Sequence, residues 1–358
     1  MCDTLVGSKD SANDTVKEGE LRTKLYVNEL INGERGLTIT SSDLSGTVVP
    51  YSRKCVGKVR DIYETDDYMI MVSTDRQSAF DRQLSAIPFK GKVLNLTSKW
   101  WFDATRALVP NHVVATPHPN VTICRKCSVF PVEFVMRGYL TGSTNTSIWT
   151  HYKNGVRQYC GHRLRNGLEK NAKLECPLLT PTTKDAMHDE PLSLGEVVSS
   201  GRMTARDASM CAKYAHALFD FSVAEAARRG LILVDTKYEF GTDASGDILL
   251  VDEVQTPDSS RYWVATSYEE RFSRGEEPEN IDKEFLRRWY ADQCDPYKDE
   301  VLPEAPTELV NELSRRYILL YEVITGQTFD FTAPTLSVTE AVKLFMDSTK
   351  EGDGVSHA

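Results

Sequence analysis

The sequence predicts a globular protein with both strands and helices, built as one large domain or as two lobes. The strands are predicted by two apolar segments, 231–240 and 248–254, that are separated by a stretch dense in turn-forming residues. The helices are predicted by apolar residues that recur at helical spacing in several other segments. A chain of 358 residues is too long for most single small hydrophobic cores, which supports one large domain or two lobes.

Composition disfavours two classes of partner. Hydrophobic residues make up 41% of the chain, but no apolar run approaches the roughly 18 residues of a membrane span. The formal net charge of −10 disfavours a nucleic-acid backbone as the main partner.

The first twenty residues lack an apolar signal core, so we expect a cytoplasmic protein. Cys124 and Cys127 form the one CxxC pair, and without a second pair a structural zinc site is not expected.

The first convincing element covers 52–63 and leads into an apolar strand, 68–72. Gly57 lies between two β-prone runs and permits a sharp bend there. Lys58 and Arg60, two residues apart, lie on one face of a strand. This pattern suits a flap that covers a phosphate, and an edge strand protected by charge is the alternative.

The polar loop 73–82 is a candidate ligand loop, because it holds acids, arginines and hydroxyls, including Asp75 and Ser78. Loops at strand ends are also polar for ordinary reasons. A helix is predicted over 91–108. In the apolar strand that follows, Glu133 is either a paired core acid or a ligand-binding group.

Arg137 ends that strand, and Gly142 and Ser143 open a helical stretch, 144–152. These groups could form an anion cradle, with an ordinary capped helix start as the alternative. Residues 153–174 are predicted to be a surface excursion. Lys184, His188 and Asp189 share a polar loop, in which a lone histidine is more often structural than catalytic.

Three segments in the second half of the chain have a helical pattern outside the hairpin at 231–254. Helical patterns cover 205–229, 282–290 and 307–324, and the last two flank a turn-rich connector, 296–306. Residues after about 330 are predicted to be a peripheral tail.

The hairpin carries the ionisable groups that suggest chemistry. Asp235, Lys237 and Glu239 share one face of the first strand, because side chains alternate. Asp252, in the second strand, converges with Glu239 only if directly paired residue numbers sum to an odd value or a bulge intervenes, and the sequence leaves this open. Converging carboxylates would suit Mg²⁺, and a solvated face with cross-strand ion pairs is the alternative. The following loop adds Asp258 and Arg261.

Six motifs in one order closely resemble those of phosphoribosylaminoimidazole-succinocarboxamide synthase, the SAICAR synthetase family. They are GKVRDIYE (57–64), STDRQSAFD (73–81), PVEFVMRGYLTGS (131–143), TPTTKDAMHD (180–189), LVDTKYEFG (233–241) and VDEVQTPDSSRYW (251–263). Each motif is weak by itself, but six in order are specific.

The resemblance implies an α+β, two-lobed fold with an antiparallel-sheet N-terminal lobe, a larger mixed second lobe and ATP in the cleft. The implied divisions are an extension at 1–50, an ATP-binding lobe at 51–130, a catalytic and substrate lobe at 131–330 and a tail at 331–358. It also implies an ATP-dependent ligase of purine biosynthesis. Such an enzyme joins carboxyaminoimidazole ribonucleotide (CAIR) to L-aspartate through a phosphorylated carboxylate and releases ADP and phosphate.

The resemblance also implies a role for each candidate residue. ATP would be bound by Gly57, Lys58, Val59, Arg60 and Glu133. Mg²⁺ would be held by Glu239 and Asp252. The catalytic group would be Lys184, Lys237 and Asp189. The other substrates would contact Asp75, Ser78, Arg137, Gly142, Ser143, Asp258 and Arg261.

Two other functions stay open at this point. A small-molecule kinase would use the same ATP and Mg²⁺ constellation but stop after phosphoryl transfer. A non-catalytic nucleotide-binding protein would keep the scaffold alone. The expected partners are the small-molecule substrates, without nucleic acid or membrane, and the sequence does not decide between a monomer and a homo-oligomer.

Overall fold

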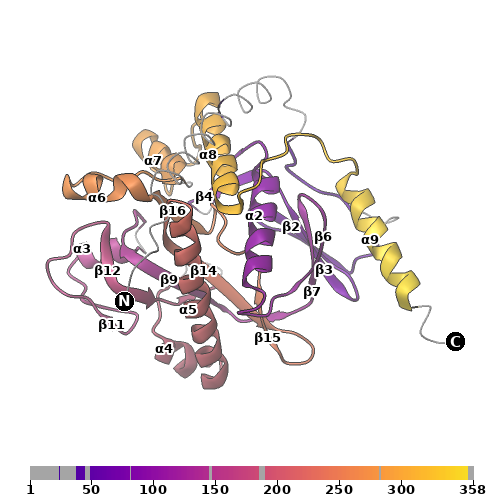
Figure 1. The fold of residues 1–358 in the computed structure, drawn as a ribbon, viewed down its shortest axis with the longest axis horizontal. Coiled ribbons are helices and arrows are strands. Elements are labelled where there is room, and N and C mark those ends of the chain that lie inside the picture. The colour runs from indigo at the N-terminus through magenta and orange to yellow at the C-terminus, as the bar shows by residue number, and fades with distance from the viewer. Residues whose placement is uncertain are drawn as a thin grey trace, which may run out of the picture. The chain divides into compact units, whose positions relative to one another are not determined.

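The computed structural model describes residues 24, 38–44, 49–80, 82–144, 147–184, 190–281 and 284–353. These residues form two compact units. Unit 1 contains the described residues of Trp101–Asn111 and Cys127–Asp282, and unit 2 contains those of Glu18–Trp100, His112–Lys126 and Lys283–Ala358. Each unit combines antiparallel strands with helices (Figure 1).

Unit 1 is built on a seven-stranded sheet. Its main path runs in the order β12, β9, β14 and β15, while β13 pairs with β9, and β8 and β16 pair with β14. The strands are β8 (Ser128–Val129), β9 (Val132–Leu140), β12 (Ala172–Leu179), β13 (Thr182–Thr183), β14 (Leu231–Thr242), β15 (Ile248–Val251) and β16 (Ser260–Val264). The long strand β14 thus contacts β8, β9, β15 and β16, which makes it the common support of the sheet.

The helices of unit 1 pack around this sheet. They are α3 (Ile148–Lys153), α4 (Leu194–Ser199), α5 (Ala205–Arg228) and α6 (Ala265–Ser273), and a small hairpin joins β10 (Gln158–Tyr159) to β11 (His162–Arg163). Helix α5 begins where the Thr204 side chain accepts a hydrogen bond from the Asp207 N–H. It then packs against β14 and β9.

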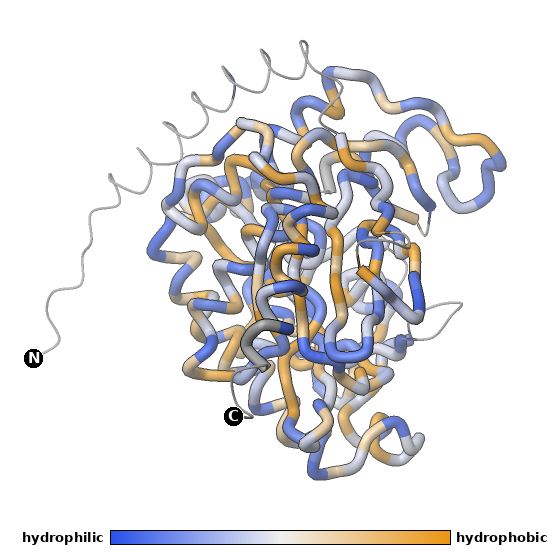
Figure 2. Tube along the Cα trace, turned by 90° about the vertical axis from the view of Figure 1, so that its right-hand side faces the viewer, coloured by the Kyte–Doolittle hydropathy of each residue, from blue (hydrophilic) through white to orange (hydrophobic). Residues whose placement is uncertain are grey.

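The two faces of β14 differ as alternation predicts. Val234, Tyr238 and Phe240 are fully buried, and the Phe240 ring makes an edge contact with Phe134 of β9 at 5.4 Å between centroids. The opposite face carries Lys237, which is partly exposed. Figure 2 shows hydrophobic and hydrophilic residues interspersed along the described chain. The predicted hairpin is therefore present, with β15 ending three residues earlier than expected.

Unit 2 is built on a five-stranded antiparallel sheet in the order β1, β2, β3, β7 and β6. These strands are β1 (Arg53–Val56), β2 (Arg60–Glu64), β3 (Tyr68–Ser73), β6 (Val113–His118) and β7 (Val121–Arg125), and a separate hairpin contains β4 (Arg76–Ala79) and β5 (Arg82–Ala86).

The helices of unit 2 contribute to two apolar cores. They are α2 (Lys90–Thr105, of which residues from Trp101 belong to unit 1), α7 (Glu284–Gln293), α8 (Thr307–Thr325) and α9 (Val338–Asp353). One core joins residues of α2, α7 and α8. The other joins the sheet to α9, where Val342 is buried beside Tyr63 and Ile70.

The C-terminal and middle segments differ from their predictions. The predicted tail contains α9, because Val338, Val342, Phe345 and Met346 recur at helical spacing and pack on the sheet. Residues 284–325, expected in the second lobe, belong to unit 2. The predicted surface excursion supplies Leu164 to a core cluster, so it is partly buried. Across the described part of the chain, no helix is both long enough and apolar enough to span a bilayer.

Candidate active site

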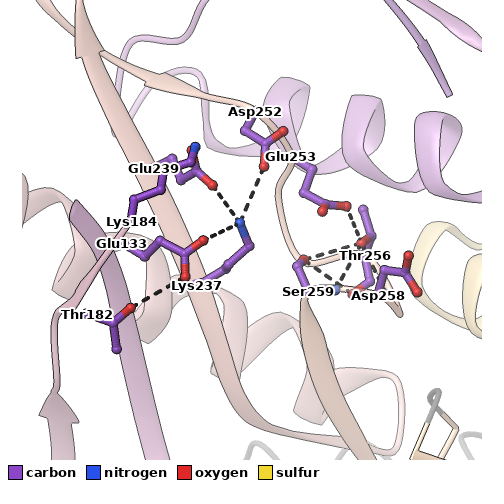
Figure 3. Close-up of polar contacts among 10 residues, drawn as sticks. All are labelled: Glu133, Thr182, Lys184, Lys237, Glu239, Asp252, Glu253, Thr256, Asp258 and Ser259. Carbon is purple, nitrogen blue, oxygen red and sulfur yellow. Dashed lines mark hydrogen bonds and ion pairs between the residues drawn. The ribbon is translucent and has the colours of Figure 1, made fainter. Parts of the chain in front are cut away.

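Lys237 lies at the centre of three carboxylates in unit 1 (Figure 3). Its Nζ is 2.6 Å from Glu239 Oε1, 3.0 Å from Glu133 Oε1 and 3.5 Å from Asp252 Oδ2. Glu239 is nearly covered, with 4% of its side chain exposed, whereas the side chains of Lys237 and Asp252 are about one quarter exposed. The cluster is therefore reachable from solvent on the Lys237 and Asp252 side.

The registers explain how Glu133 and Glu239 reach Lys237. Lys237 of β14 pairs with Val135 of β9, and Tyr238 pairs with Phe134. Glu133 is two residues from Val135 along β9, so it faces the same side as Lys237. Glu239, two residues from Lys237, faces that side too.

Asp252 joins the cluster for a different reason. Glu239 pairs directly with Val251, so paired residue numbers sum to an even value, and a continued strand would turn Asp252 to the other face. Strand β15 ends at Val251, however, and the backbone at Asp252 is left-handed, with φ of 65°. This conformation is uncommon for a residue other than glycine, and it directs the carboxylate back toward Lys237.

The carboxylates fix the protonation state of Lys237. Burial acts to lower the pKa of this ammonium group, but the charges of Glu239, Glu133 and Asp252 outweigh it and place the pKa well above 10.5. Lys237 is thus a permanent cation near neutral pH. It can attract developing negative charge, but it is not available as a base.

A second lysine approaches from the neighbouring loop. Lys184 follows the short strand β13, and its Nζ contacts Glu239 Oε2, while 46% of its side chain is exposed. Thr182 of the same segment lies 3.5 Å from Glu133. Asp189, the third predicted catalytic residue, lies outside the described residues.

Two arginines flank an acid farther along the same strand. Asp235 of β14 pairs with Arg137 of β9 on one side and with Arg261 of β16 on the other. Arg261 Nη1 is 2.7 Å from Asp235 Oδ2, and Arg137 Nη1 is 3.6 Å from it. Because one carboxylate stands between two guanidinium groups, the trio keeps one excess positive charge that an anion can balance.

The glycine loop after β9 approaches this pair. Gly142 has a φ of 114°, and a Cβ added there would lie 2.4 Å from the Ser147 Cβ and 3.5 Å from Arg261 Nη1. A side chain at this position would therefore be both strained and obstructed. Ser143, next in the chain, is exposed.

The loop after Asp252 holds Asp258 in place. The Thr256 hydroxyl donates to Glu253 Oε2 at 2.6 Å and accepts from the backbone N–H of Asp258 at 3.3 Å. In Figure 3, Glu253 and Asp258 gather around Thr256, whereas Asp252 turns toward Lys237. Adjacent acids thus serve two different clusters.

The predicted phosphate flap is a tight connection in unit 2. Gly57 lies between β1 and β2, and its N–H donates to the Arg60 carbonyl at 2.7 Å. Arg76 stabilises this turn, because its Nη2 donates hydrogen bonds to the Gly57 carbonyl at 2.9 Å and to Asp61 Oδ1 at 2.7 Å. The Thr74 N–H holds the Val59 carbonyl at 2.9 Å.

Asp75 and Ser78 are the predicted substrate contacts of unit 2, and they follow the flap segment in the sequence. Asp75 is 2% exposed, and its two oxygens accept backbone N–H groups of Ile39 and Gly91, each at 2.7 Å. Burial raises its pKa to about 6 despite those bonds. Ser78 pairs with Gln83 in the β4–β5 hairpin.

Comparisons with known proteins show which family the chain resembles. Residues 54–304 match the family described as SAICAR synthetase. The chain is 60% identical over 286 residues to phosphoribosylaminoimidazole-succinocarboxamide synthase of Legionella pneumophila (strain Lens), covering 80% of this chain and 92% of that protein. It is 57% identical over 292 residues to the chloroplastic synthase of Arabidopsis thaliana, covering 82% and 71%.

A solved structure extends the likeness to three dimensions. The SAICAR synthase of Saccharomyces cerevisiae, complexed with SAICAR, is 31% identical, with a TM-score of 0.69 over 82% of this chain and 99% of that one. The chain belongs to the SAICAR synthetase family. The predicted family and its α+β fold are confirmed, and the enzyme class follows: an ATP-dependent carbon–nitrogen ligase of purine biosynthesis.

Membership of the SAICAR synthetase family leaves neither earlier alternative, the kinase or the non-catalytic protein, favoured. The structure brings together Glu133, Lys184, Lys237, Glu239 and Asp252 in one cluster. It brings Arg137, Gly142 and Arg261 together in another. Gly57, Lys58, Val59 and Arg60 belong to unit 2, so they form a separate group.

Sequence reasoning missed the supporting residues of this family site. Arg76 was noted only as part of a polar loop, yet it is 4% exposed and forms a buried ion pair with Asp61. For Arg76 the available signal was its place directly after a strand end, beside the glycine turn in space but not in sequence.

The carboxylates of Lys237's cluster fit a magnesium ion that is shared with phosphates. In the described ranges, no three His, Cys, Asp or Glu side chains are grouped so that they could hold a metal alone. Glu239 and Asp252 each direct an oxygen toward Lys237 Nζ, so a cation already balances them. Mg²⁺ commonly takes one or two carboxylates and completes its shell with water and phosphate oxygens. The donor set therefore suits that shared mode.

Proposed function

We propose that this chain joins CAIR to L-aspartate with ATP, giving SAICAR, ADP and phosphate. The yeast relative forms a complex with SAICAR, which supports this choice of product. The observation that carries the proposal is the face of β14. It holds an ammonium group among carboxylates at Lys237 and an arginine pair at Asp235, about 7 Å apart along the strand. A substrate with a reacting carboxylate and a distant phosphate fits that spacing of charges.

The reaction is a pair of displacements. A carboxylate oxygen of CAIR attacks the γ-phosphorus of ATP, ADP leaves, and an acyl phosphate forms. The amine of L-aspartate then attacks the carbonyl carbon, loses a proton, and phosphate leaves with the bridging oxygen. Lys237 and Lys184 act as fixed positive charges on the oxygens of the transferred group, which is the main way that proteins lower such barriers.

Other residues bind and orient the substrates. The ATP phosphates would be covered by Gly57, Lys58, Val59 and Arg60. Glu133 would keep Lys237 in position. We also predict that Glu133 lies near the adenine of ATP. Arg137, Gly142, Ser143 and Arg261 would bind the ribonucleotide phosphate, and Asp258 would bind its amino-imidazole. Glu239 and Asp252 would hold Mg²⁺, which when bound neutralises charge on the phosphates that it shares.

A substrate-omission experiment tests this function. The full chain is incubated with CAIR, ATP, Mg²⁺ and L-aspartate, and ADP and SAICAR are quantified together. The proposal expects equal amounts of both products and no SAICAR when any one substrate is left out. ADP formation without amide would instead indicate a kinase, and no turnover with any combination would indicate a binding protein.

Several narrower predictions are kept as part of the proposal. Asp75, Ser78 and Asp189 are predicted to line the substrate side, and a cytoplasmic location is expected. The chain is expected to act as a monomer or a homo-oligomer.

A further inference from the structure

Unit 2 contains a cavity that shares one residue, Asp75, with the proposed substrate contacts and none with the Lys237 cluster. Its volume is about 380 Å³, within the range of small-molecule sites. The walls come from the start of α2, from the β6–β7 turn and from the strap 332–338, which joins α8 to α9. Asp75 also lines it. Both Asp75 oxygens accept backbone N–H groups, which stabilise the negative charge that this carboxylate carries above its pKa of about 6.

The floor of the cavity holds an unused hydrogen-bond donor. His118 is 4% exposed, and its Nδ1 accepts the Asn120 N–H at 3.0 Å, so the ring proton lies on Nε2. No described residue accepts from this Nε2–H group. Burial, together with nearby Lys92, lowers the pKa of His118 to about 4, so the ring is neutral near pH 7. A ligand oxygen in the cavity could accept this N–H.

A buried cation stands near that donor. Lys92 is 7% exposed and lines the same cavity. Its Nζ donates to the carbonyls of Asp330 and Thr332 and lies 5.1 Å from the centroid of the Phe329 ring, and one of its three N–H groups makes no hydrogen bond to a described residue. The nearest carboxylate, Asp330, is 4.0 Å away and two-thirds exposed. A buried ammonium group with so weak a counter-charge favours an anion.

The remaining walls are mostly apolar. Ile39, Phe89 and Val338 line the cavity, and Leu336 stands at its exposed rim with 38% of its surface accessible. One cation and one neutral donor match the two oxygens of a single carboxylate.

We propose that this cavity binds a small, mostly apolar monocarboxylate. Its carboxylate accepts hydrogen bonds from His118 Nε2 and Lys92 Nζ, and its apolar body packs against Phe89, Leu336 and Val338. This is a second ligand site, distinct from the Lys237 cluster.

Calorimetric titration of the full chain tests the site with benzoate, hexanoate and indole-3-acetate, each compared with its primary amide. We expect saturable binding of at least one carboxylate with one site per chain, and at least about tenfold weaker binding of its amide, because the amide lacks the charge that Lys92 balances. Absence of saturable binding by all three carboxylates, or equal binding of the amide, would overturn the proposal.

Two variants locate the bound molecule. Leu336→Trp should fill the rim and weaken carboxylate binding at least about tenfold, whereas Leu344→Trp, on the exposed side of α9, should leave it unchanged. Lys92→Met should abolish binding, and Leu336→Trp keeps the test informative if that variant fails to fold. Binding that survives Leu336→Trp, or that saturating L-aspartate displaces, would place the molecule elsewhere and refute the assignment.

Discussion

The carboxylate of Asp252 lies 3.5 Å from Lys237 Nζ although the pairing of β14 with β15 would turn it away. A left-handed backbone at Asp252 reverses its direction. Such conformations cost of order 1–3 kcal/mol and persist where the surrounding structure holds them, often at functional sites. Here the gain is a third carboxylate beside a lysine, next to an edge that solvent reaches.

Asp252→Asn should remove activity and preserve the fold. Asparagine tolerates the left-handed conformation, so the backbone is kept while the charge is lost. We expect kcat/KM to fall by about 100-fold, the scale seen when one group of a preorganised electrostatic site is removed. Steady-state assays and urea unfolding check both parts. Asp247→Asn, in the exposed turn of the same hairpin, is the matched control and should retain full activity.

Arg261→Gln should mainly weaken binding of the ribonucleotide. The variant loses a charge-assisted contact with phosphate, worth about 1.5–3 kcal/mol, so KM for CAIR should rise by about 10-fold or more. KM for ATP should stay within about twofold, because the two phosphates are bound by different groups. The control is Arg274→Gln, since Arg274 pairs with Glu270 in an exposed position. An unchanged KM for CAIR in Arg261→Gln would argue against the phosphate role.

Asp61→Ala should destabilise unit 2 and disturb its glycine turn. Asp61 is fully buried with Arg76, and leaving that guanidinium unpaired should cost about 3–5 kcal/mol in the free energy of unfolding. KM for ATP should rise as well, because Arg76 also holds the Gly57 carbonyl.

The matched control for that variant is Glu64→Ala on the same strand. Glu64 pairs with Lys126 at 2.9 Å, but both side chains are more than one-third exposed, so its loss should cost only about 0–1 kcal/mol. Urea titration measures both variants. Equal losses from Asp61→Ala and Glu64→Ala would show that the buried pair has no special weight.

Asp75 should make stability fall as pH rises through 6. Burial raises its folded-state pKa from 3.8 to about 6, so the folded protein holds this proton more tightly than the unfolded chain. The stabilisation is complete below about pH 3.8 and is lost above about pH 6. Relative to Asp75→Asn, the wild type should gain about 1.4 kcal/mol between pH 8 and pH 5, measured by urea unfolding. A difference that is constant across this range would contradict the raised pKa.

Much of the fold could be predicted because it depends on local periodicity. The alternation in 231–240 predicts the buried face at Tyr238 and the polar face at Lys237, and both are observed. Helix α5 covers Ala205–Arg228, close to the 205–229 that its apolar spacing predicts, and Thr204 caps its start. The segment after 330 was misjudged because its pattern gains a partner only when α9 meets the distant β-strands of unit 2.

The site was predictable in its chemistry but not in its geometry. The family motifs identify Lys237, Glu239 and Asp252, yet strand register and a single left-handed residue decide whether their side chains meet. Contacts between distant segments, such as Arg76 with Asp61 and Gly57, leave no periodic signal. Such contacts were visible only after the chain was folded.

The phosphorylated carboxylate is tested most directly by following oxygen. CAIR labelled with ¹⁸O in its carboxylate is converted with ATP and L-aspartate, and the inorganic phosphate is analysed by mass spectrometry. Attack of the carboxylate on ATP followed by amide formation predicts one labelled oxygen in each phosphate released. Unlabelled phosphate alongside normal SAICAR formation would contradict it.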